Sequence, residues 1–97
     1  MVDETTFRVR WANRTCRLGN TYPFWLLERL ARRPNQFVSY EVLFRDVWDD
    51  DYTSAEAVRS AVKTLRRKLN AAGMEDLAEA IDGSNSRHYA LRLVKRD

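Results

Sequence analysis

Cysteine, histidine and glycine are scarce in this sequence, and the shortage excludes several classes of protein. The 97 residues include one cysteine, one histidine and three glycines. The single cysteine, Cys16, has no partner for an internal disulfide, which excludes a disulfide-stapled secreted scaffold and fits a reducing compartment. Neither Cys16 nor His88 has a sequence neighbour that would activate it, so we expect no enzymatic activity and no cofactor.

Long apolar runs and a basic N-terminus are also missing. No apolar run approaches the roughly 18 to 20 residues that span a bilayer. The first four residues include two acids and no base, whereas a secretory signal begins with a basic segment. We therefore expect a cytoplasmic protein without a membrane partner. The length, with 44% hydrophobic and 32% charged residues, predicts a single domain over residues 1–97.

Positive charge is concentrated toward the C-terminal part of the chain. Residues 1–58 carry eight Lys or Arg and nine Asp or Glu, whereas residues 59–97 carry nine and five. Residues 59–68 contain five basic residues and no acid. A local patch of this kind attracts phosphates.

Alternating apolar and polar residues predict an N-terminal hairpin within about residues 6–18. In residues 6–11, Phe7, Val9 and Trp11 alternate with arginines, which is typical of a half-buried strand. A turn at residues 12–14 then leads to a second strand over residues 15–18.

Three helices are predicted next, over about residues 22–33, 40–48 and 54–71. Thr21 and Pro23 favour the start of the first helix, and Ser39 is a good N-cap for the second. Thr53 and Glu56 match a capping box at the start of the third. The third helix carries an apolar stripe at helical spacing, formed by Val58, Ala61, Val62, Leu65 and Leu69.

The C-terminal part predicts a β-hairpin over about residues 79–94. Residues 74–81 have a helical composition but precede a turn, and we interpret them as a connection that leads into a strand. Residues 82–86 form a turn, and residues 88–93 alternate with Tyr89, Leu91 and Leu93 on one face. The order of elements predicts an α+β fold, a winged helix-turn-helix with small N-terminal antiparallel strands and a C-terminal wing.

The polar face of the third helix holds the candidate binding residues. An α-helix fits the major groove of B-DNA, where Arg and Lys reach guanine acceptors or phosphates and Ser and Thr reach either. The charge run alone would equally suit a solvated helix; the following wing favours DNA. The candidate DNA-binding residues are Arg59, Ser60, Lys63, Thr64, Arg66, Arg67 and Lys68, with Arg87 at the wing tip.

Three segments give the chain a resemblance to the OmpR/PhoB-type DNA-binding domains of bacterial transcription regulators. They are residues 24–34, residues 38–43 with Val47-Trp48, and residues 58–69 ending in Leu65-Arg66-Arg67-Lys68-Leu69. The resemblance implies that the third helix enters the major groove, with Lys63, Thr64 and Arg66 at the contact positions, and that the wing lies at the minor groove. It also implies that the loop of Asp49, Asp50 and Asp51 is a candidate contact for RNA polymerase.

Two departures from the family pattern affect this interpretation. The wing turn, from Gly83 to Tyr89, is longer than the usual Gly-x-Gly-Tyr turn, and Ala61 stands where many relatives have histidine. The acidic run at residues 49–51 lacks the glycine and terminal acid of an EF-hand, so we expect no metal site.

Two functions remain open from the sequence. The first is a transcription regulator whose partner is double-stranded DNA, with RNA polymerase and a second copy of the chain on DNA as further candidate partners. The second is a winged helix that serves as a protein-interaction module, through its acidic loop or its Arg-rich sheet edge.

Overall fold

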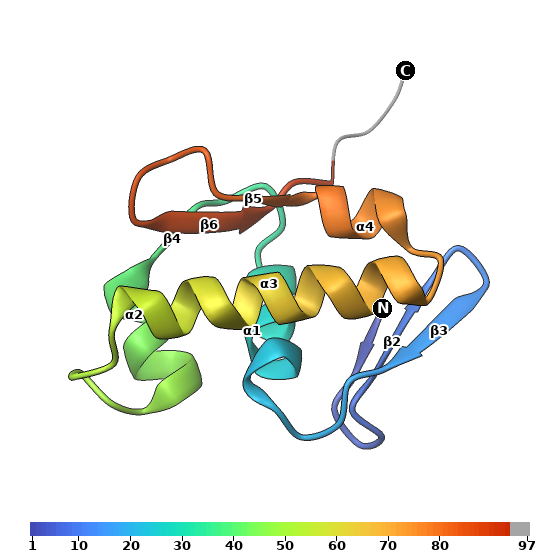
Figure 1. Ribbon diagram of the computed structural model, residues 1–97, viewed down its shortest axis with the longest axis horizontal. Coiled ribbons are helices and arrows are strands. Elements are labelled where there is room, and N and C mark those ends of the chain that lie inside the picture. The colour runs from blue at the N-terminus through green and yellow to red at the C-terminus, as the bar shows by residue number, and fades with distance from the viewer. Residues whose placement is uncertain (94–97) are drawn as a thin grey trace.

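Two small antiparallel sheets lie against a group of helices in the computed structural model, which describes residues 1–93 (Figure 1). The N-terminal sheet has the order β1-β2-β3, formed by β1 (Val2–Asp3), β2 (Arg8–Trp11) and β3 (Arg14–Arg17). The C-terminal sheet has the order β4-β6-β5, formed by β4 (Val38–Ser39), β6 (His88–Leu91) and β5 (Ile81–Asp82). The helices are α1 (Tyr22–Ala31), α2 (Tyr40–Leu43) with its π-helical continuation η1 (Phe44–Trp48), α3 (Ala55–Ala71) and α4 (Glu75–Glu79). The predicted α+β winged-helix fold class is confirmed.

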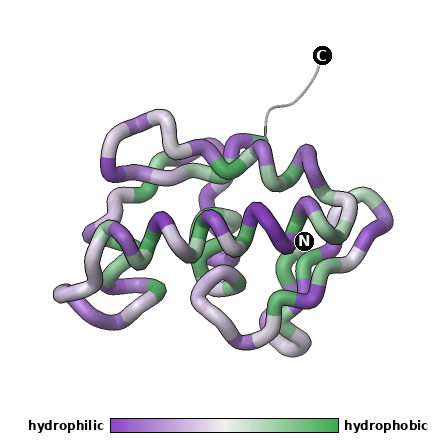
Figure 2. The backbone as a smooth tube through the Cα atoms, in the orientation of Figure 1, coloured by the Kyte–Doolittle hydropathy of each residue, from purple (hydrophilic) through white to green (hydrophobic). Residues whose placement is uncertain are grey.

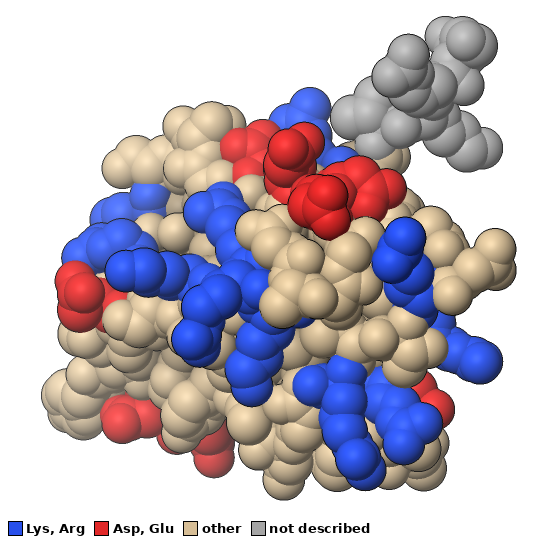
Figure 3. Space-filling model, turned by 45° about the vertical axis from the view of Figure 1, so that its right-hand side comes forward, with Lys and Arg blue, Asp and Glu red and all other residues tan. Residues whose placement is uncertain are grey.

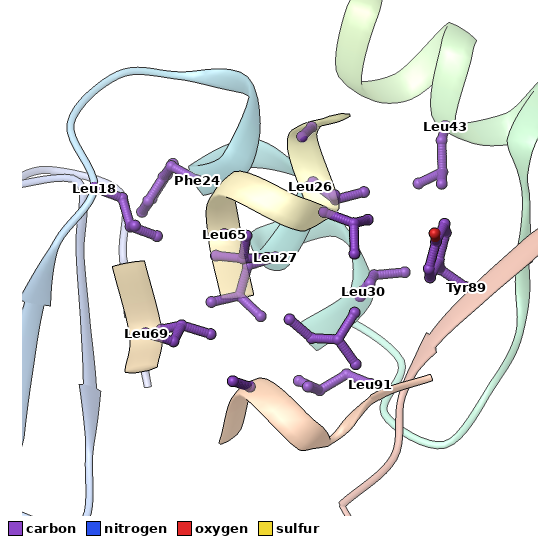
Figure 4. Close-up of a cluster of buried hydrophobic side chains, with 14 of the residues drawn as sticks. Leu18, Phe24, Leu26, Leu27, Leu30, Leu43, Leu65, Leu69, Tyr89 and Leu91 are labelled. Carbon is purple, nitrogen blue, oxygen red and sulfur yellow. The ribbon is translucent and has the colours of Figure 1, made fainter. Parts of the chain in front are cut away.

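The core lies between α1, α3 and the C-terminal sheet. The apolar stripe of α3 is buried as predicted, and Figure 2 shows hydrophobic and hydrophilic positions interleaved along this helix. Leu27 and Leu30 of α1, Leu65 of α3 and Leu91 of β6 are fully buried, and their side chains converge in Figure 4. This packing fixes which side of α3 faces outward. Within residues 1–93, no helix combines the length and the apolar character needed to cross a bilayer.

The helix starts confirm one predicted cap and correct another. The Ser39 hydroxyl accepts a hydrogen bond from the Val42 N–H at 3.2 Å, as an N-cap does. The capping box predicted at Thr53 is wrong, because the N-cap of α3 is Ser54, whose hydroxyl accepts from the Ala57 N–H at 3.2 Å. The Thr53 hydroxyl instead donates to the Asp50 carbonyl at 2.8 Å and closes the preceding loop.

The N-terminal sheet differs from its prediction at the start of the first predicted strand and in having one additional strand. The first predicted strand begins at Arg8, because Phe7 has a left-handed φ of 53° and its carbonyl accepts hydrogen bonds from the N–H groups of Leu18 and Gly19. The Phe7 ring still packs edge-on against Phe24, with ring centroids 5.4 Å apart. The short strand β1, which the sequence analysis did not predict, pairs with the start of β2.

Residues 74–81 contain a helix, so their interpretation as a plain connection is wrong. The helix α4 buries Leu77 and Ala78, and the Asp76 carboxylate accepts a hydrogen bond from the Trp11 indole N–H at 2.9 Å. Its stability therefore comes from tertiary contacts, since so short a helix is marginal by itself. The hairpin predicted over about residues 79–94 pairs only Ile81 with Leu91 and Asp82 with Ala90, and residue 94 lies outside the described residues.

Strand β4 was also not predicted, because its two residues are too few to show an alternating pattern. Val38 and Ser39 pair with Tyr89 and His88, so the chain entering α2 forms an edge of the wing sheet. The wing is thereby tied to the start of α2.

Gly73 ends α3 in a conformation that favours glycine. Its φ is +77°, and an added Cβ would lie 2.5 Å from Nη1 of Arg14, the mobile end of a long side chain. We expect Gly73→Ala to lower the free energy of unfolding by about 1 kcal/mol, because a left-handed backbone disfavours alanine. Urea denaturation measures this loss. Gly73→Asn is the matched control, since asparagine also carries a Cβ but tolerates the left-handed region, and equal losses in both variants would contradict the explanation.

Candidate nucleic-acid interface

The outward surface of α3 consists of three strips of polar residues. Lys63 and Arg67 lie on its outermost strip and are exposed. Ser60, Thr64 and Lys68 face the beginning of α1 across a surface groove. Arg59 and Arg66 lie on the side of the wing, near Tyr89, whose phenol they influence electrostatically. Each strip offers a different kind of contact to a partner.

The outermost strip carries basic groups that no acid neutralises. Within residues 1–93, neither Lys63 nor Arg67 forms an ion pair or a side-chain hydrogen bond, in contrast to Arg59 on the adjacent strip. The burial of Leu65 and Leu69 on the opposite side of α3 holds both side chains toward solvent. Their charges are thus available to an anionic partner without loss of an internal contact.

A groove of about 430 Å³ separates α3 from the beginning of α1. The Tyr22 ring, 51% exposed, stacks on Trp48 with centroids 5.0 Å apart and planes 21° apart. The sequence analysis did not single out Tyr22 or its contact with Trp48, because no local pattern indicates a contact between these two segments. The residues that line the groove are Thr21, Tyr22, Pro23, Trp48, Ala57, Ser60, Ala61, Thr64 and Lys68.

Arg59 forms an exposed ion pair within α3. Its Nη2 lies 3.0 Å from Oε2 of Glu56, three residues earlier, and this carboxylate raises the pKa of the guanidinium. An exposed pair of this kind contributes little to stability, because solvent screens both charges. Arg59 can therefore exchange Glu56 for a phosphate at little cost.

Arg66 joins α3 to the wing. The half-buried side chain donates a hydrogen bond from Nη2 to the Ile81 carbonyl of β5 at 2.6 Å. Hydrogen bonds from Ser84 hold the pKa of Asp82 below its usual value, and the charges of Arg92 and Arg66 lower it further. The structure thus places Arg66 at the root of the wing, away from the outermost strip where Lys63 lies.

Arg87 folds back from the wing onto the start of α2. Its Nη2 lies 2.6 Å from Oε2 of Glu41, and its guanidinium carbon lies 5.2 Å from the centre of the Tyr40 ring. The Arg87 carbonyl accepts the Tyr40 N–H at 3.0 Å, and its φ is 57°. The hydrogen bond from Arg87 lowers the pKa of Glu41. Sequence analysis found Arg87 but neither partner, since Tyr40 and Glu41 are remote in the chain.

Basic side chains dominate the side of the molecule seen in Figure 3. Lys and Arg cover the middle of this view and continue toward its lower right, whereas Asp and Glu gather mainly along its upper and lower margins. The separation of charge is therefore a property of the folded surface as well as of the sequence.

The order of elements and the basic surface of α3 agree with the comparison to known families. Residues 18–91 match the family described as "Transcriptional regulatory protein, C terminal". The chain belongs to this family, the OmpR/PhoB-type domains. It is a DNA-binding domain of a transcription regulator.

Two solved structures of response-regulator DNA-binding domains share the fold. The DNA-binding domain of the response regulator AdeR, solved in complex with an intercistronic region, has a TM-score of 0.75 at 20% identity, covering 95% of this chain and 92% of that chain. The C-terminal DNA-binding domain of RstA from Klebsiella pneumoniae has a TM-score of 0.73 at 22% identity, covering 100% of this chain and 86% of that chain. A comparison with curated proteins gave no match.

The loop between α2 and α3 of this OmpR/PhoB-type domain is acidic and exposed. Asp49, Asp50 and Asp51 all lie at the surface, and Asp49 has a left-handed φ of 54°. A carboxylate oxygen of Asp50 accepts the Tyr52 N–H at 2.9 Å. Among residues 1–93, no group of three or more His, Cys, Asp or Glu side chains is arranged to hold a metal ion.

The side chains of Cys16 and His88 both make contacts within the fold. Cys16 is buried, its Sγ lies 3.6 Å from the Lys68 carbonyl, and burial raises the pKa of the thiol. Nδ1 of His88 lies 2.7 Å from the Ser86 carbonyl within the wing. A thiol with a raised pKa is a poor nucleophile at neutral pH.

Proposed function

We propose that this domain binds double-stranded DNA in the cytoplasm with α3 in the major groove and the β5–β6 wing at the minor groove. The carrying observation is the outermost strip of α3, where Lys63 and Arg67 are exposed and unpaired within residues 1–93. An α-helix about 10 to 12 Å wide fits the major groove, where Lys and Arg reach guanine acceptors and phosphates. The AdeR domain, which shares this fold, was solved in complex with an intercistronic region, and this supports DNA as the partner.

The strips of α3 suggest separate roles in this complex. We assign base or backbone contacts in the groove to Lys63, Thr64 and Arg67, and phosphate contacts to Arg59, Ser60 and Lys68. Arg66 contributes by holding the wing through its 2.6 Å hydrogen bond to the Ile81 carbonyl. Arg87 does the same at the other end through Glu41, because its guanidinium is already engaged at 2.6 Å.

The proposed activity is binding without catalysis. The buried Cys16 thiol has a raised pKa, and this supports a packing role for it. We further propose that the exposed acidic loop of Asp49, Asp50 and Asp51 contacts RNA polymerase while α3 holds DNA. Neutralising all three with Asn is then expected to leave DNA affinity intact and to reduce transcription from a bound promoter.

A salt titration of duplex binding tests the DNA proposal. Four phosphate contacts, from Arg59, Lys63, Arg67 and Lys68, predict a slope of about −3.6 in a plot of log affinity against log salt. Affinity should then fall about 100-fold between roughly 50 and 200 mM salt. Fluorescence anisotropy with a labelled duplex measures it.

One further experiment reports the DNA sequence that is bound and the number of copies of the chain that bind it. Selection of bound sequences from a random duplex pool reports the operator, and the spacing of recovered half-sites shows whether a second copy binds beside the first. If no duplex binds at low salt while a protein partner is captured through the acidic loop, the domain is an interaction module instead.

A further inference from the structure

The arginines of the described chain divide into those with an acidic partner and those without one. Six arginines lie within 2.6 to 3.6 Å of a carboxylate, namely Arg29, Arg32, Arg45, Arg59, Arg87 and Arg92. Within residues 1–93, Arg8, Arg10 and Arg17 of the N-terminal sheet have no such partner, although all three are exposed. They share this state with Lys63 and Arg67 of α3.

The unpaired sheet arginines lie together because of the register of β2 and β3. Val9 pairs with Cys16 and both are buried, so the alternation of side chains turns the flanking pairs to the outer face. Arg8 lies directly opposite Arg17, and Arg10 lies opposite Thr15. We call Arg8, Arg10 and Arg17 the arginine face.

This arrangement is unfavourable in the isolated domain. Directly opposed residues of an antiparallel pair have Cβ atoms about 4.5 to 5.5 Å apart, and like charges at that spacing destabilise the sheet. Asp3 of β1 lies opposite Arg8 on the other side, but its carboxylate accepts hydrogen bonds from Thr5 and forms no ion pair with Arg8 within residues 1–93. A bound anion would relieve the repulsion between Arg8 and Arg17.

The arginine face lies near the C-terminal end of α3. Cys16 of β3 contacts the Lys68 carbonyl of α3 at 3.6 Å, and Figure 1 shows the sheet at this end of the helix. In Figure 3, which brings that end forward, basic side chains occupy both the middle of the view and its lower right. The inner face of β2 and β3 packs toward this end of α3, so the arginine face is the outer side of the same strands, where a partner that extends past the end of α3 would reach it.

We propose that the arginine face binds the phosphate backbone of DNA that flanks the segment held by α3. This inference rests on the proposed function. The guanidinium fork matches phosphate oxygens, and all three residues are arginine. DNA already bound through α3 supplies its flanking phosphates at high effective concentration, which favours it over an acidic protein that must be recruited separately.

Duplexes of two lengths distinguish the contribution of α3 to binding from that of the arginine face. The longest extent of the domain is 38 Å, equivalent to about 11 base pairs at 3.4 Å each. A hairpin-closed duplex of about 8 base pairs, roughly 27 Å long, covers the 17 residues of α3 but not the whole domain, and a duplex of about 30 base pairs also supplies both flanks. The variant Arg8→Gln/Arg10→Gln/Arg17→Gln removes the charges, and Arg33→Gln/Arg45→Gln is a control that removes exposed arginines elsewhere.

The expected result is a length effect that only the sheet variant abolishes. Wild-type protein should bind the long duplex with a salt slope steeper by about 2 to 3 than the short duplex, since each contact contributes about 0.9. The sheet variant should bind the long duplex about 10- to 100-fold more weakly at roughly 100 mM salt and the short duplex within about twofold of wild type. The control should keep the length effect.

Each other outcome counts against a defined part of the proposal. If the sheet variant binds the long duplex with wild-type affinity and slope, the arginine face does not contact DNA, and the proposed function stands on the short-duplex titration alone. If neither duplex binds any form of the protein, both proposals fail. Thermal melting of the sheet variant at low salt should match or exceed wild type, because the substitutions remove the repulsion between Arg8 and Arg17.

Discussion

The variant Lys63→Ala/Arg67→Ala is expected to bind its duplex about 100-fold more weakly than wild type. Each side chain that reaches a base edge or phosphate is worth about 1 to 3 kcal/mol, and about 2.7 kcal/mol in total corresponds to a 100-fold loss. Both residues are exposed and unpaired within residues 1–93, so their removal takes no contact from the fold. Fluorescence anisotropy at fixed salt measures the change.

The salt dependence of the same variant shows what Lys63 and Arg67 touch. If both contact phosphates, the slope should become shallower by about 2, whereas a base contact relaxes the preference for one sequence. Arg33→Ala/Arg45→Ala, which removes two exposed arginines outside α3, is the control and should bind within a few-fold of wild type. Wild-type affinity in the Lys63/Arg67 variant would remove α3 from the interface.

Leu65→Ala is expected to cause the largest loss of stability. Leu65 is 0% exposed and packs at the centre of the core (Figure 4). Such a truncation removes apolar contacts and leaves a cavity, at a cost of about 2 to 5 kcal/mol out of a typical total of about 5 to 15. For a domain of this size, the melting temperature should fall by about 10 to 30 °C.

Thermal unfolding followed by circular dichroism measures this loss. Asn70→Ala, an exposed substitution near the end of the same helix, is the control and should change the free energy of unfolding by less than about 0.5 kcal/mol. DNA affinity of the Leu65 variant, measured well below its melting temperature, should stay close to wild type. A loss of stability below about 1 kcal/mol would show that α3 does not pack on α1 as described.

The success of the sequence analysis depended on how local each signal is. The stripe of α3 repeats every three or four residues, and the Ser39 cap depends on an N–H three residues away, so both are visible in the chain alone. The helix α4 and the strand β4 were missed for the opposite reason. They depend on the burial of Leu77 and on the pairing of Val38 with Tyr89, which neighbours in the sequence do not reveal.

The sequence alone determined the family, the fold class and the basic outward face of α3 that contains Lys63 and Arg67. Those features follow from helical periodicity and from charge at fixed spacing. Only the tertiary structure decided which basic residues are already engaged. The partners of Arg66 and Arg87 are the Ile81 carbonyl and the Glu41 carboxylate, which folding brings within 2.6 Å. A charge is available for DNA only when no such neighbour holds it, and that depends on contacts between distant parts of the chain.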